Sequence, residues 1–285
     1  MKEIVIISGK GGSGKTSISS SLISLAGSCI ICDCDVEAPN LHILLQPETK
    51  SAEDFYGLPK ARIDSDECIQ CDICIDKCRF DAISDYTVLE DNCEGCHFCY
   101  RLCPVDAITM VEHVCGQSFF SVSLYGNMFH ARLGIGEQNS GKLVALLRER
   151  ANEFAIRQNE DLIITDGPPG IGCPTIATLS GADMAVIVSE PTMSAIHDMI
   201  RTIELCNHFK IKHTVLINKA DLNPEKTGEI YRYCQEASIP VLGEVPFDKK
   251  FRDAINNQQI PVDYSPDIRT IMEPIWQNLK RLLAF

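Results

Sequence analysis

The sequence contains little positive charge and no long apolar stretch. Lysine and arginine total 26 against 39 aspartate and glutamate residues, which gives a formal net charge of −13. Because non-specific binding to nucleic acid depends on clustered lysine and arginine, this composition argues against a nucleic-acid partner. No apolar stretch approaches the roughly 18 residues that a membrane-spanning helix needs, so a membrane location is not expected.

The first residues also lack the pattern of a secretion signal. Residues 1–8 form an apolar, β-branched run that includes Glu3, and a glycine-rich loop follows it at once. This arrangement is typical of a buried parallel strand and not of a signal peptide. The 15 cysteines of the chain are therefore expected to be metal ligands in a reducing cytoplasm and not disulfide partners.

Eight of the cysteines form two runs with the same spacing. Each run is C-x2-C-x2-C-x3-C, and every cysteine of the second run lies 25 residues after its counterpart. The similarity extends further, because residues 81–83 and 106–108 are both Asp-Ala-Ile. This duplication has the spacing of a bacterial ferredoxin with two [4Fe–4S] clusters. Zinc is the alternative metal, and the paired four-cysteine runs favour iron–sulfur clusters over it.

The spacing also predicts which cysteines share a cluster. Three cysteines of a run can hold one cluster, whereas the fourth ligates the other cluster. One cluster is therefore assigned to Cys68, Cys71, Cys74 and Cys103. The other is assigned to Cys78, Cys93, Cys96 and Cys99. Arg79 follows the first run where Pro104 follows the second, and its charge would either raise the reduction potential of the nearby cluster or neutralise acidic neighbours.

The cysteine runs lie in an acidic segment. Residues 64–112 hold twelve acidic side chains and three lysines or arginines. This surface would suit a basic docking face on a redox or cofactor-assembly partner, although a simply solvated surface has the same composition. We predict that residues 60–112 form a small inserted α+β ferredoxin-like domain. Crossed ligation would tie its halves together, because about 50 residues bury too little core to be stable alone.

The rest of the chain alternates apolar runs with helical stretches. This pattern predicts a doubly wound α/β domain with a mostly parallel sheet, made discontinuously from residues 1–59 and 113–285. Strands are expected at 2–8, 29–34, 161–166, 183–189, 213–218 and 240–245, and helices at 15–27, 141–158, 193–209 and 224–237. Residues 117–133 contain two strand-like runs around a turn sequence, which predicts an antiparallel hairpin.

A phosphate-binding loop follows the first expected strand. Residues 9–16 are Gly-Lys-Gly-Gly-Ser-Gly-Lys-Thr, a P-loop whose glycines let backbone N–H groups face phosphates at a helix N-terminus. Lys15 is expected to contact the β- and γ-phosphates and Thr16 to bind Mg²⁺. The predicted nucleotide-binding residues of this loop are Gly9, Lys10, Gly11, Gly12, Ser13, Gly14, Lys15, Thr16 and Ser17.

The early lysine makes this loop resemble the deviant Walker A motif of the MinD-type ATPases, a P-loop NTPase family that includes the nitrogenase iron protein. The resemblance covers essentially all of the chain outside the insert. It implies an ATPase, stimulated by a partner, that binds ATP and Mg²⁺. It also implies a homodimer in the ATP state, because the family's early lysine, here Lys10, reaches the partner subunit's nucleotide.

Two further segments resemble the switch regions of that family. In residues 33–41 Asp35 is expected to orient the attacking water or a water bound to Mg²⁺, with Asp33 as the second choice. Residues 166–170 are Asp-Gly-Pro-Pro-Gly, in which Asp166 would be an outer-shell partner of Mg²⁺. With Lys10 and Lys15, Asp35 and Asp166 complete the predicted catalytic set, since phosphoryl transfer depends mainly on positioning and charge.

Two segments bear on the base. Residues 218–221 are Asn-Lys-Ala-Asp, which matches the guanine-reading motif of GTPases. In MinD-type proteins, however, an asparagine at the end of this strand contacts adenine, and the loop around Pro246 resembles the base-proximal turn of the family. We therefore expect Asn218 and Pro246 to contact ATP, with GTP as the alternative.

Cys173 and the C-terminal segment each have two interpretations. The nitrogenase iron protein places a cluster ligand at an offset from its switch II aspartate similar to that of Cys173 from Asp166. Cys173 is accordingly either a metal or substrate ligand at a dimer axis or a structural loop cysteine. The apolar positions of residues 268–283 fit a membrane-surface helix or a helix packed on the core, and core packing is favoured.

These features together predict an ATP-gated iron–sulfur protein. Nucleotide-dependent dimerisation would be coupled to electron transfer, in the assembly of a metal cofactor or of Fe–S clusters. A carrier or scaffold for an Fe–S or other metal cluster is the first alternative. A regulatory ATPase switch with structural or oxygen-sensing clusters is the second.

Overall fold

The computed structural model describes residues 1–134, 136–137 and 140–284, which divide into two compact units. The first unit consists of Met1–Ala52, Ser118–Arg132 and the residues from Ser140 onward. The second unit consists of Glu53–Gln117 and a short stretch from Leu133. Within the part of the chain that is described, no helix is long and apolar enough to cross a membrane.

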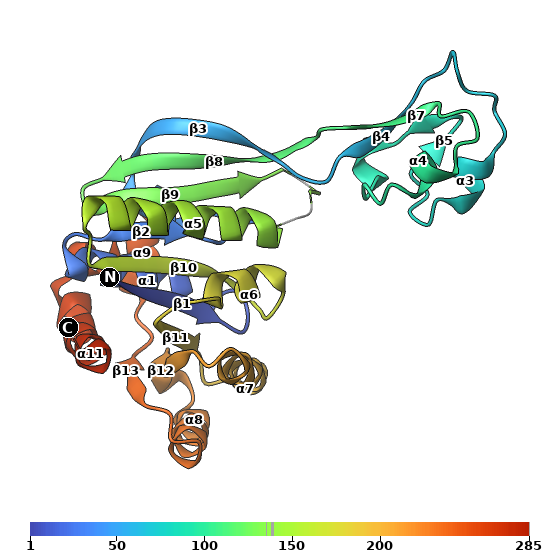
Figure 1. Cartoon of the computed structure of the whole chain (residues 1–285). Coiled ribbons are helices and arrows are strands. Elements are labelled where there is room, and N and C mark those ends of the chain that lie inside the picture. The colour runs from blue at the N-terminus through green and yellow to red at the C-terminus, as the bar shows by residue number, and fades with distance from the viewer. Residues whose placement is uncertain (135, 138–139, 285) are drawn as a thin grey trace. The chain divides into compact units, whose positions relative to one another are not determined.

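A nine-stranded sheet forms the centre of the first unit (Figure 1). Its strand order is β13-β12-β11-β1-β10-β2-β9-β8-β3, and neighbouring strands from β13 to β9 pair in parallel. The predicted mostly parallel α/β sheet is therefore confirmed. The strands are β1 Lys2–Ser8, β2 Ile30–Asp33, β3 Glu48–Tyr56, β8 Val114–Ser123, β9 Gly126–Leu133, β10 Leu162–Pro169, β11 Met184–Ser189, β12 Lys212–Asn218 and β13 Val241–Val245.

Both faces of this sheet are covered because its central strands are apolar at nearly every position. In β1, Ile4 and Ile6 join the core beneath α1, α2, α10 and α11, whereas Val5 and Ile7 join the core beneath α6, α7 and α8. The helices of this unit are α1 Lys15–Ala26, α2 Leu41–Leu45, α5 Ser140–Gln158, α6 Cys173–Leu179, α7 Met193–His208, α8 Pro224–Glu236, α9 Lys249–Asn256, α10 Pro261–Tyr264 and α11 Pro266–Leu283.

The C-terminal helix α11 belongs to this core. Its buried apolar residues are Ile268, Met272, Ile275, Trp276, Leu279 and Leu283. The apolar face is thus already in contact with the protein, which confirms the predicted core packing.

A buried ion pair connects four elements of the first unit. Arg148 of α5 donates to both carboxylate oxygens of Glu3 in β1, at 2.9 and 2.5 Å. The hydroxyl of Thr165 in β10 donates to the same carboxylate at 2.9 Å, and Arg148 also donates to two carbonyl oxygens, those of Ala177 in α6 and Ser180 just beyond it. Because both the Arg148 guanidinium and the Glu3 carboxylate are hydrogen-bonded, no buried charge is left unpaired. The pair therefore fixes α5 and α6 against the sheet.

The predicted hairpin is formed by β8 and β9, which are neighbours in the sheet and run in opposite directions in Figure 1. Its turn requires glycine, because Gly126 has a φ of 130° and an added Cβ would lie 2.0 Å from the carbonyl oxygen of Cys29. Strand β3 was not predicted, and its side chains are exposed except Phe55. An edge strand of this kind lacks the apolar pattern by which strands are recognised.

The second unit contains two small antiparallel sheets and two short helices. Strand β4 (Lys60–Ile63) pairs with β7 (Ile108–Val111), and β5 (Ile83–Ser84) pairs with β6 (Thr87–Val88). The helices are α3 Ile73–Lys77 and α4 Phe98–Leu102, with a short 3₁₀ turn at Glu90–Asn92 between them. The unit extends beyond the expected 60–112 at both ends, since β3 and β8 continue through Glu53 and Gln117.

The sequence duplication is repeated in the backbone of the second unit. Left-handed φ angles occur at Gln70, Asp72 and Asp81, and again 25 residues later. The later positions are Gly95, His97 and Asp106. The two halves therefore follow the same local path around their cysteines.

Candidate nucleotide site and cysteine cavities

The P-loop lies between β1 and α1, with glycines where close contacts leave no room for a side chain. A Cβ at Gly14, whose φ is 87°, would lie 2.3 Å from the side-chain nitrogen of Asn218. A Cβ at Gly9 would lie 2.4 Å from the Cβ of Asp198 in α7. The loop is therefore held tightly between β12 and α7, which fixes its backbone ahead of any ligand.

Two adjoining cavities open on this loop. The larger, about 680 Å³, is lined by Gly11–Ser17, by residues 34–38 and by Pro168 and Pro169. The smaller, about 300 Å³, is lined by Asn218, Pro246 and the residues after it, and shares Gly12, Gly14 and Ser17 with the first. The structure thus brings the predicted phosphate loop and both switch segments together, with the predicted base-side residues next to them.

Asp166 is buried beside the P-loop and is the centre of its polar contacts. The ammonium group of Lys15 lies 3.1 Å from Asp166 Oδ1 and 3.8 Å from Asp35 Oδ2. Thr16 Oγ1 donates to Asp166 Oδ2 at 2.9 Å, and Ser19 Oγ donates to Oδ1 at 2.7 Å. Ser19 was not predicted, although its position one helical turn after Lys15 on α1 is a signal that could have identified it.

Burial and charge shift the protonation of these groups. Burial alone would lower the pKa of Lys15, but the carboxylates of Asp166 and Asp35 raise it above its usual value, so the lysine stays charged. Burial and the charge of Asp166 raise the pKa of Asp33 well above its ordinary value. Burial also raises the pKa of Asp35. A divalent cation among these carboxylates would offset their mutual repulsion.

Asp33 and Asp35 occupy different positions. Asp33 is completely buried, with Oδ1 accepting from the Asp35 N–H at 3.2 Å and Oδ2 without a hydrogen-bond partner among the described residues. Asp35 lines the larger cavity itself. The geometry therefore favours Asp35 over Asp33 as the carboxylate that can reach a ligand or a water molecule.

Lys10 is held within its own subunit in this structure. Its ammonium group lies 2.7 Å from Glu190 Oε1 and within 3.4 Å of the hydroxyls of Thr192 and Ser194. Glu190 also pairs with Lys219 at 2.8 Å, and Lys219 donates to the Gly12 carbonyl at 3.1 Å. Burial would raise the pKa of Glu190, but hydrogen bonds from both lysines lower it. Glu190 has no sequence signal, because only the fold brings the end of β11 to the P-loop.

The side chains of the Asn-Lys-x-Asp segment are largely bonded to the protein. Asn218 Nδ2 donates to the Ser13 carbonyl at 2.7 Å, and its Oδ1 accepts from the Lys219 N–H at 3.0 Å. Asp221 Oδ1 accepts from the Phe247 N–H at 2.6 Å and is not among the described residues that line the smaller cavity. Asp221 therefore holds the turn after Pro246, which weakens the guanine interpretation.

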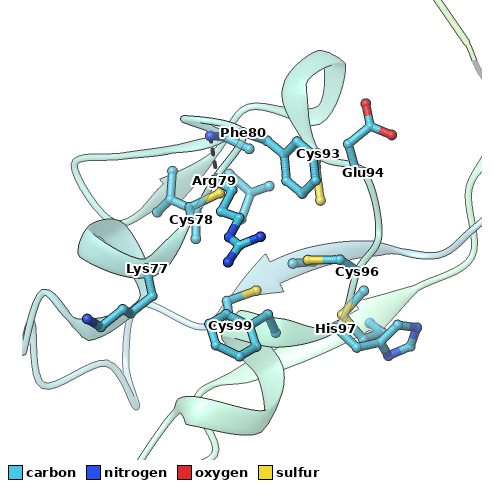
Figure 2. A pocket seen from close by; sticks show the side chains of 15 residues that line it. Lys77, Cys78, Arg79, Phe80, Cys93, Glu94, Cys96, His97 and Cys99 are labelled. Atoms are coloured by element: carbon cyan, nitrogen blue, oxygen red, sulfur yellow. Dashed lines mark hydrogen bonds between the residues drawn. The ribbon is translucent and has the colours of Figure 1, made fainter.

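The eight repeated cysteines line two cavities in the second unit. One cavity, about 350 Å³, is lined by Cys78, Cys93, Cys96 and Cys99 (Figure 2). The other, about 20 Å³, is lined by Cys68, Cys71, Cys74 and Cys103. This is the division of the cysteines that the spacing predicted, with one cysteine from the opposite run in each set.

The sulfur atoms of the exchanged cysteines have equivalent partners. The Ala82 N–H donates to Cys78 Sγ at 3.4 Å, and the Ala107 N–H donates to Cys103 Sγ at 3.2 Å. Among the described residues, no group of three potential ligands is close enough together to hold a single metal ion. The donor set is nevertheless four thiols per cavity, the ligands that a [4Fe–4S] cluster takes.

Cys173 belongs to the first unit and is not among the described residues that line these cavities. It is the exposed first residue of α6 and follows Gly172, with Gly141 packed against it. Cys173 is not among the described residues that line either cavity of the nucleotide site, whereas Cys34 lines the larger one. Its two interpretations, as a ligand or as a loop cysteine, both remain predictions.

A P-loop between a buried strand and a helix, with carboxylates from β2 and β10 beside it, defines a P-loop nucleotide-binding protein of the α/β class. Comparison with family models assigns it more closely. The CobQ/CobB/MinD/ParA nucleotide-binding domain matches residues 4–262, and the chain belongs to that family. It is a MinD/ParA-like ATPase.

Three relatives illustrate the range of similarity. An uncharacterized protein of Methanocaldococcus jannaschii is 32% identical over 99% of this chain and 97% of its own length. The structure of the septum site-determining protein MinD with Mg-ADP from Pyrococcus horikoshii has a TM-score of 0.61 at 15% identity, covering 99% and 97% of the two chains, which shows a shared fold. A cytosolic Fe-S cluster assembly factor Nubp1 homolog of Drosophila ananassae is 27% identical over 35% of this chain and 38% of its own.

Proposed function

We propose that this protein is an ATP-hydrolysing iron–sulfur protein that couples nucleotide-dependent dimerisation to electron transfer during assembly of a metal cofactor or of Fe–S clusters. The observation that carries the proposal is the presence, in one chain, of a complete P-loop site and two cavities each lined by four cysteines. The partial similarity to an Fe–S cluster assembly factor supports the same direction.

In the nucleotide site the roles follow from the contacts. Lys15 and the N–H groups of Gly11–Ser17 bind the phosphates, and Thr16 binds Mg²⁺. Asp166 already accepts hydrogen bonds from Thr16 and Lys15, and it is an outer-shell partner of that ion. Asp35 orients the attacking water from the cavity wall. Asn218 braces the loop through Ser13, and Pro246 lies at the adenine side.

In the second unit the two cysteine sets hold one [4Fe–4S] cluster each, and residues 60–112 form the inserted ferredoxin-like domain. Bound clusters supply one-electron transfer without proton chemistry. The chain's own contribution is the thiolate ligands, the N–H groups of Ala82 and Ala107, and the acidic surface that a basic redox partner recognises. A partner of this kind would also stimulate ATP hydrolysis.

Dimerisation in the ATP state requires Lys10 to change partners. In the present structure Glu190 holds it within the subunit. Release from Glu190 frees the ammonium group for the γ-phosphate of a nucleotide on a second copy of the chain. Exchange of this ion pair for a contact with the second copy would therefore link nucleotide binding to dimerisation.

A cluster carrier or scaffold is the second candidate, and the exposure of Cys173 favours it. A carrier would lose its cluster to an acceptor protein that lacks one. Clusters that each have a complete set of four cysteines should instead be retained. A regulatory switch would show nucleotide-dependent dimerisation with no redox readout. These expectations separate the three readings in one preparation of the protein.

The proposal is tested by anaerobic purification followed by metal analysis and nucleotide titration. We expect about eight iron and eight acid-labile sulfide per chain, with ATP bound at least tenfold more tightly than GTP, about 1.4 kcal/mol. Zinc in place of iron, or a single cluster, would contradict the iron–sulfur assignment. A preference for GTP would contradict the assignment of the base.

A further inference from the structure

The two cysteine cavities differ in size and in charge. We name the cavity of Cys78, Cys93, Cys96 and Cys99 the open cavity, and the cavity of Cys68, Cys71, Cys74 and Cys103 the closed cavity. The open cavity has about 350 Å³ and the closed cavity about 20 Å³. The described residues around the closed cavity include no lysine, arginine, aspartate or glutamate, whereas Lys77, Arg79 and Glu94 line the open one.

Arg79 is the charged group most directly associated with the open cavity. Figure 2 shows its guanidinium group directed into the space between Cys78 and Cys93 on one side and Cys96 and Cys99 on the other. No ion pair with a carboxylate within 4.0 Å is recorded for it among the described residues. Arg79 follows Cys78 directly in the chain, so its backbone is tethered next to one ligand of this cavity.

The second half of the duplication has no such group. The residue that corresponds to Arg79 is Pro104, which lines the closed cavity without charge. The N–H bonds to Cys78 and Cys103 are equivalent in the two halves, at 3.4 and 3.2 Å. Backbone hydrogen bonding to these two sulfurs therefore does not distinguish the cavities, and the side-chain charge does.

Charge of this sign has a defined effect on a cluster. Four thiolates give a [4Fe–4S] cluster a net negative charge, and reduction adds one more negative charge. An arginine remains protonated at any accessible pH, so its attraction is larger for the reduced form. Net charge, hydrogen bonds to sulfur and solvent exposure are the factors that set cluster potentials.

We infer that Arg79 makes the cluster of the open cavity the one with the higher reduction potential, so that an electron entering the second unit rests there. The inference depends on the proposed iron–sulfur function. With clusters bound, the internal step would move one electron from the cluster held by Cys68, Cys71, Cys74 and Cys103 to the cluster held by Cys78, Cys93, Cys96 and Cys99, with no proton transferred. Arg79 is not a ligand of the cluster; its positive charge stabilises the reduced form.

The test is a potentiometric titration of the full-length, anaerobically purified protein, followed by EPR. Arg79→Gln is expected to lower the reduction potential of the cluster in the open cavity by about 59 mV or more, which is a tenfold change in a one-electron equilibrium. The potential of the other cluster should be nearly unchanged. Arg79→Lys keeps the charge and should retain most of the wild-type difference. Cys96→Ser, which changes one ligand of the open cavity, identifies the EPR signal of that cluster.

Arg101→Gln is the matched control. It removes one positive charge from the same unit, two residues before Cys103, but Arg101 does not line either cavity. If Arg79→Gln and Arg101→Gln shift both potentials equally, the effect is general and the inference is wrong. Unchanged potentials in Arg79→Gln, with eight iron per chain, overturn the inference and leave the proposed function intact. A protein that binds no cluster overturns both.

If Arg79→Gln fails to incorporate clusters, the comparison rests on Arg79→Lys and Lys77→Gln. Both variants keep a positive charge at position 79. Only Lys77→Gln removes the second cation that lines the open cavity. Lys77→Gln should then lower the potential of the same EPR signal by less than a tenfold change in the equilibrium. A shift of the other signal instead would overturn the inference.

Discussion

The first unit buries apolar side chains on both faces of a sheet, whereas the second unit buries very few. In β1 alone, Ile4, Val5, Ile6 and Ile7 are fully inaccessible to solvent. Within residues 60–112 the buried apolar side chains are Ala61, Ala82, Ile83, Ala107 and Ile108. A core of three alanines and two isoleucines cannot offset the conformational entropy of about 50 residues. The first unit is thus stabilised by its core, whereas the proposed function assigns the stability of the second unit to clusters held by its cysteines.

Metal removal is the sharpest way to break this comparison. We expect anaerobic iron removal to abolish amide-exchange protection across residues 60–112, because metal binding there supplies the folding free energy. Protection in β1 and β10 should be unchanged. Hydrogen exchange with mass spectrometry measures both units in one sample, and a mock-treated protein is the control. Retained protection in the second unit after complete iron loss would show that its small core is sufficient.

Arg148→Met tests the stability of the first unit by breaking its buried ion pair. The substitution leaves the Glu3 carboxylate buried without its cation, and we expect a loss of about 3–5 kcal/mol in unfolding free energy. Trp276 is the only tryptophan of the chain and is buried in the first unit, so its fluorescence reports this unit during denaturation. The control Arg157→Met, at an exposed position of the same helix, should change stability by about 0.5 kcal/mol or less.

The pH dependence of the first unit provides a smaller effect. His130 of β9 stacks on Phe119 and is hydrogen-bonded to Ser121, and burial, with a contribution from His42, lowers its pKa to about 4. A depressed pKa means that the unfolded chain binds the proton first. Stability is therefore full above about pH 6.5 and falls as the pH drops toward 4, by about 2 kcal/mol between pH 7.5 and pH 5.

Denaturation of wild type and His130→Gln at those two pH values, followed by Trp276 fluorescence, measures this contribution. Glutamine keeps a polar group beside Ser121 but does not titrate. Its stability should change with pH by about 2 kcal/mol less than that of wild type. Equal pH dependence in the two proteins would mean that other groups are responsible.

The two units also differ in what sequence could predict. In the first unit, β1, β10 and β12 were expected within a residue or a few of their observed ends, because long apolar β-branched runs are specific to buried strands. The strand β3 was missed because its polar residues at a sheet edge carry no such pattern. In the second unit the division of the cysteines followed from spacing alone, since a short run limits which sulfurs can meet.

The candidate site shows the same limit. The P-loop was predicted from its motif, and Asp35 and Asp166 from their resemblance to the switch regions of the family; the structure places all three together. Ser19 was overlooked despite its helical spacing from Lys15, and Glu190 had no local signal at all. The contact of Glu190 with Lys10 depends on the parallel pairing of β1 with β11, because this pairing brings the ends of the two strands together. Contacts set by strand order, and not by neighbours in sequence, are what the sequence alone did not provide.

Glu190→Gln asks whether a change confined to the first unit reaches the second. Glutamine holds Lys10 and Lys219 less strongly than a carboxylate does, because hydrogen bonds to an ionised group are stronger by about 1 kcal/mol or more. We expect ATP-dependent dimerisation to strengthen about tenfold, which corresponds to about 1.4 kcal/mol, as measured by analytical ultracentrifugation. Lys10→Ala should bind ATP, since Lys15 and the loop remain, but should not dimerise. Unchanged or weaker dimerisation of Glu190→Gln would contradict the role given to this pair.

Glu229→Gln is the matched control, because Glu229 pairs with Lys226 at 2.6 Å on the surface of α8 and should leave dimerisation unaltered. Wild type, Glu190→Gln and Lys10→Ala then test coupling between the units. If dimerisation gates the clusters, ATP should shift their potentials in wild type and, at lower protein concentration, in Glu190→Gln, but not in Lys10→Ala. Coupling is reciprocal, so cluster oxidation state should change ATP affinity by the same factor. ATP affinities that are equal with oxidised and reduced clusters would mean that the second unit responds to its own redox partner alone.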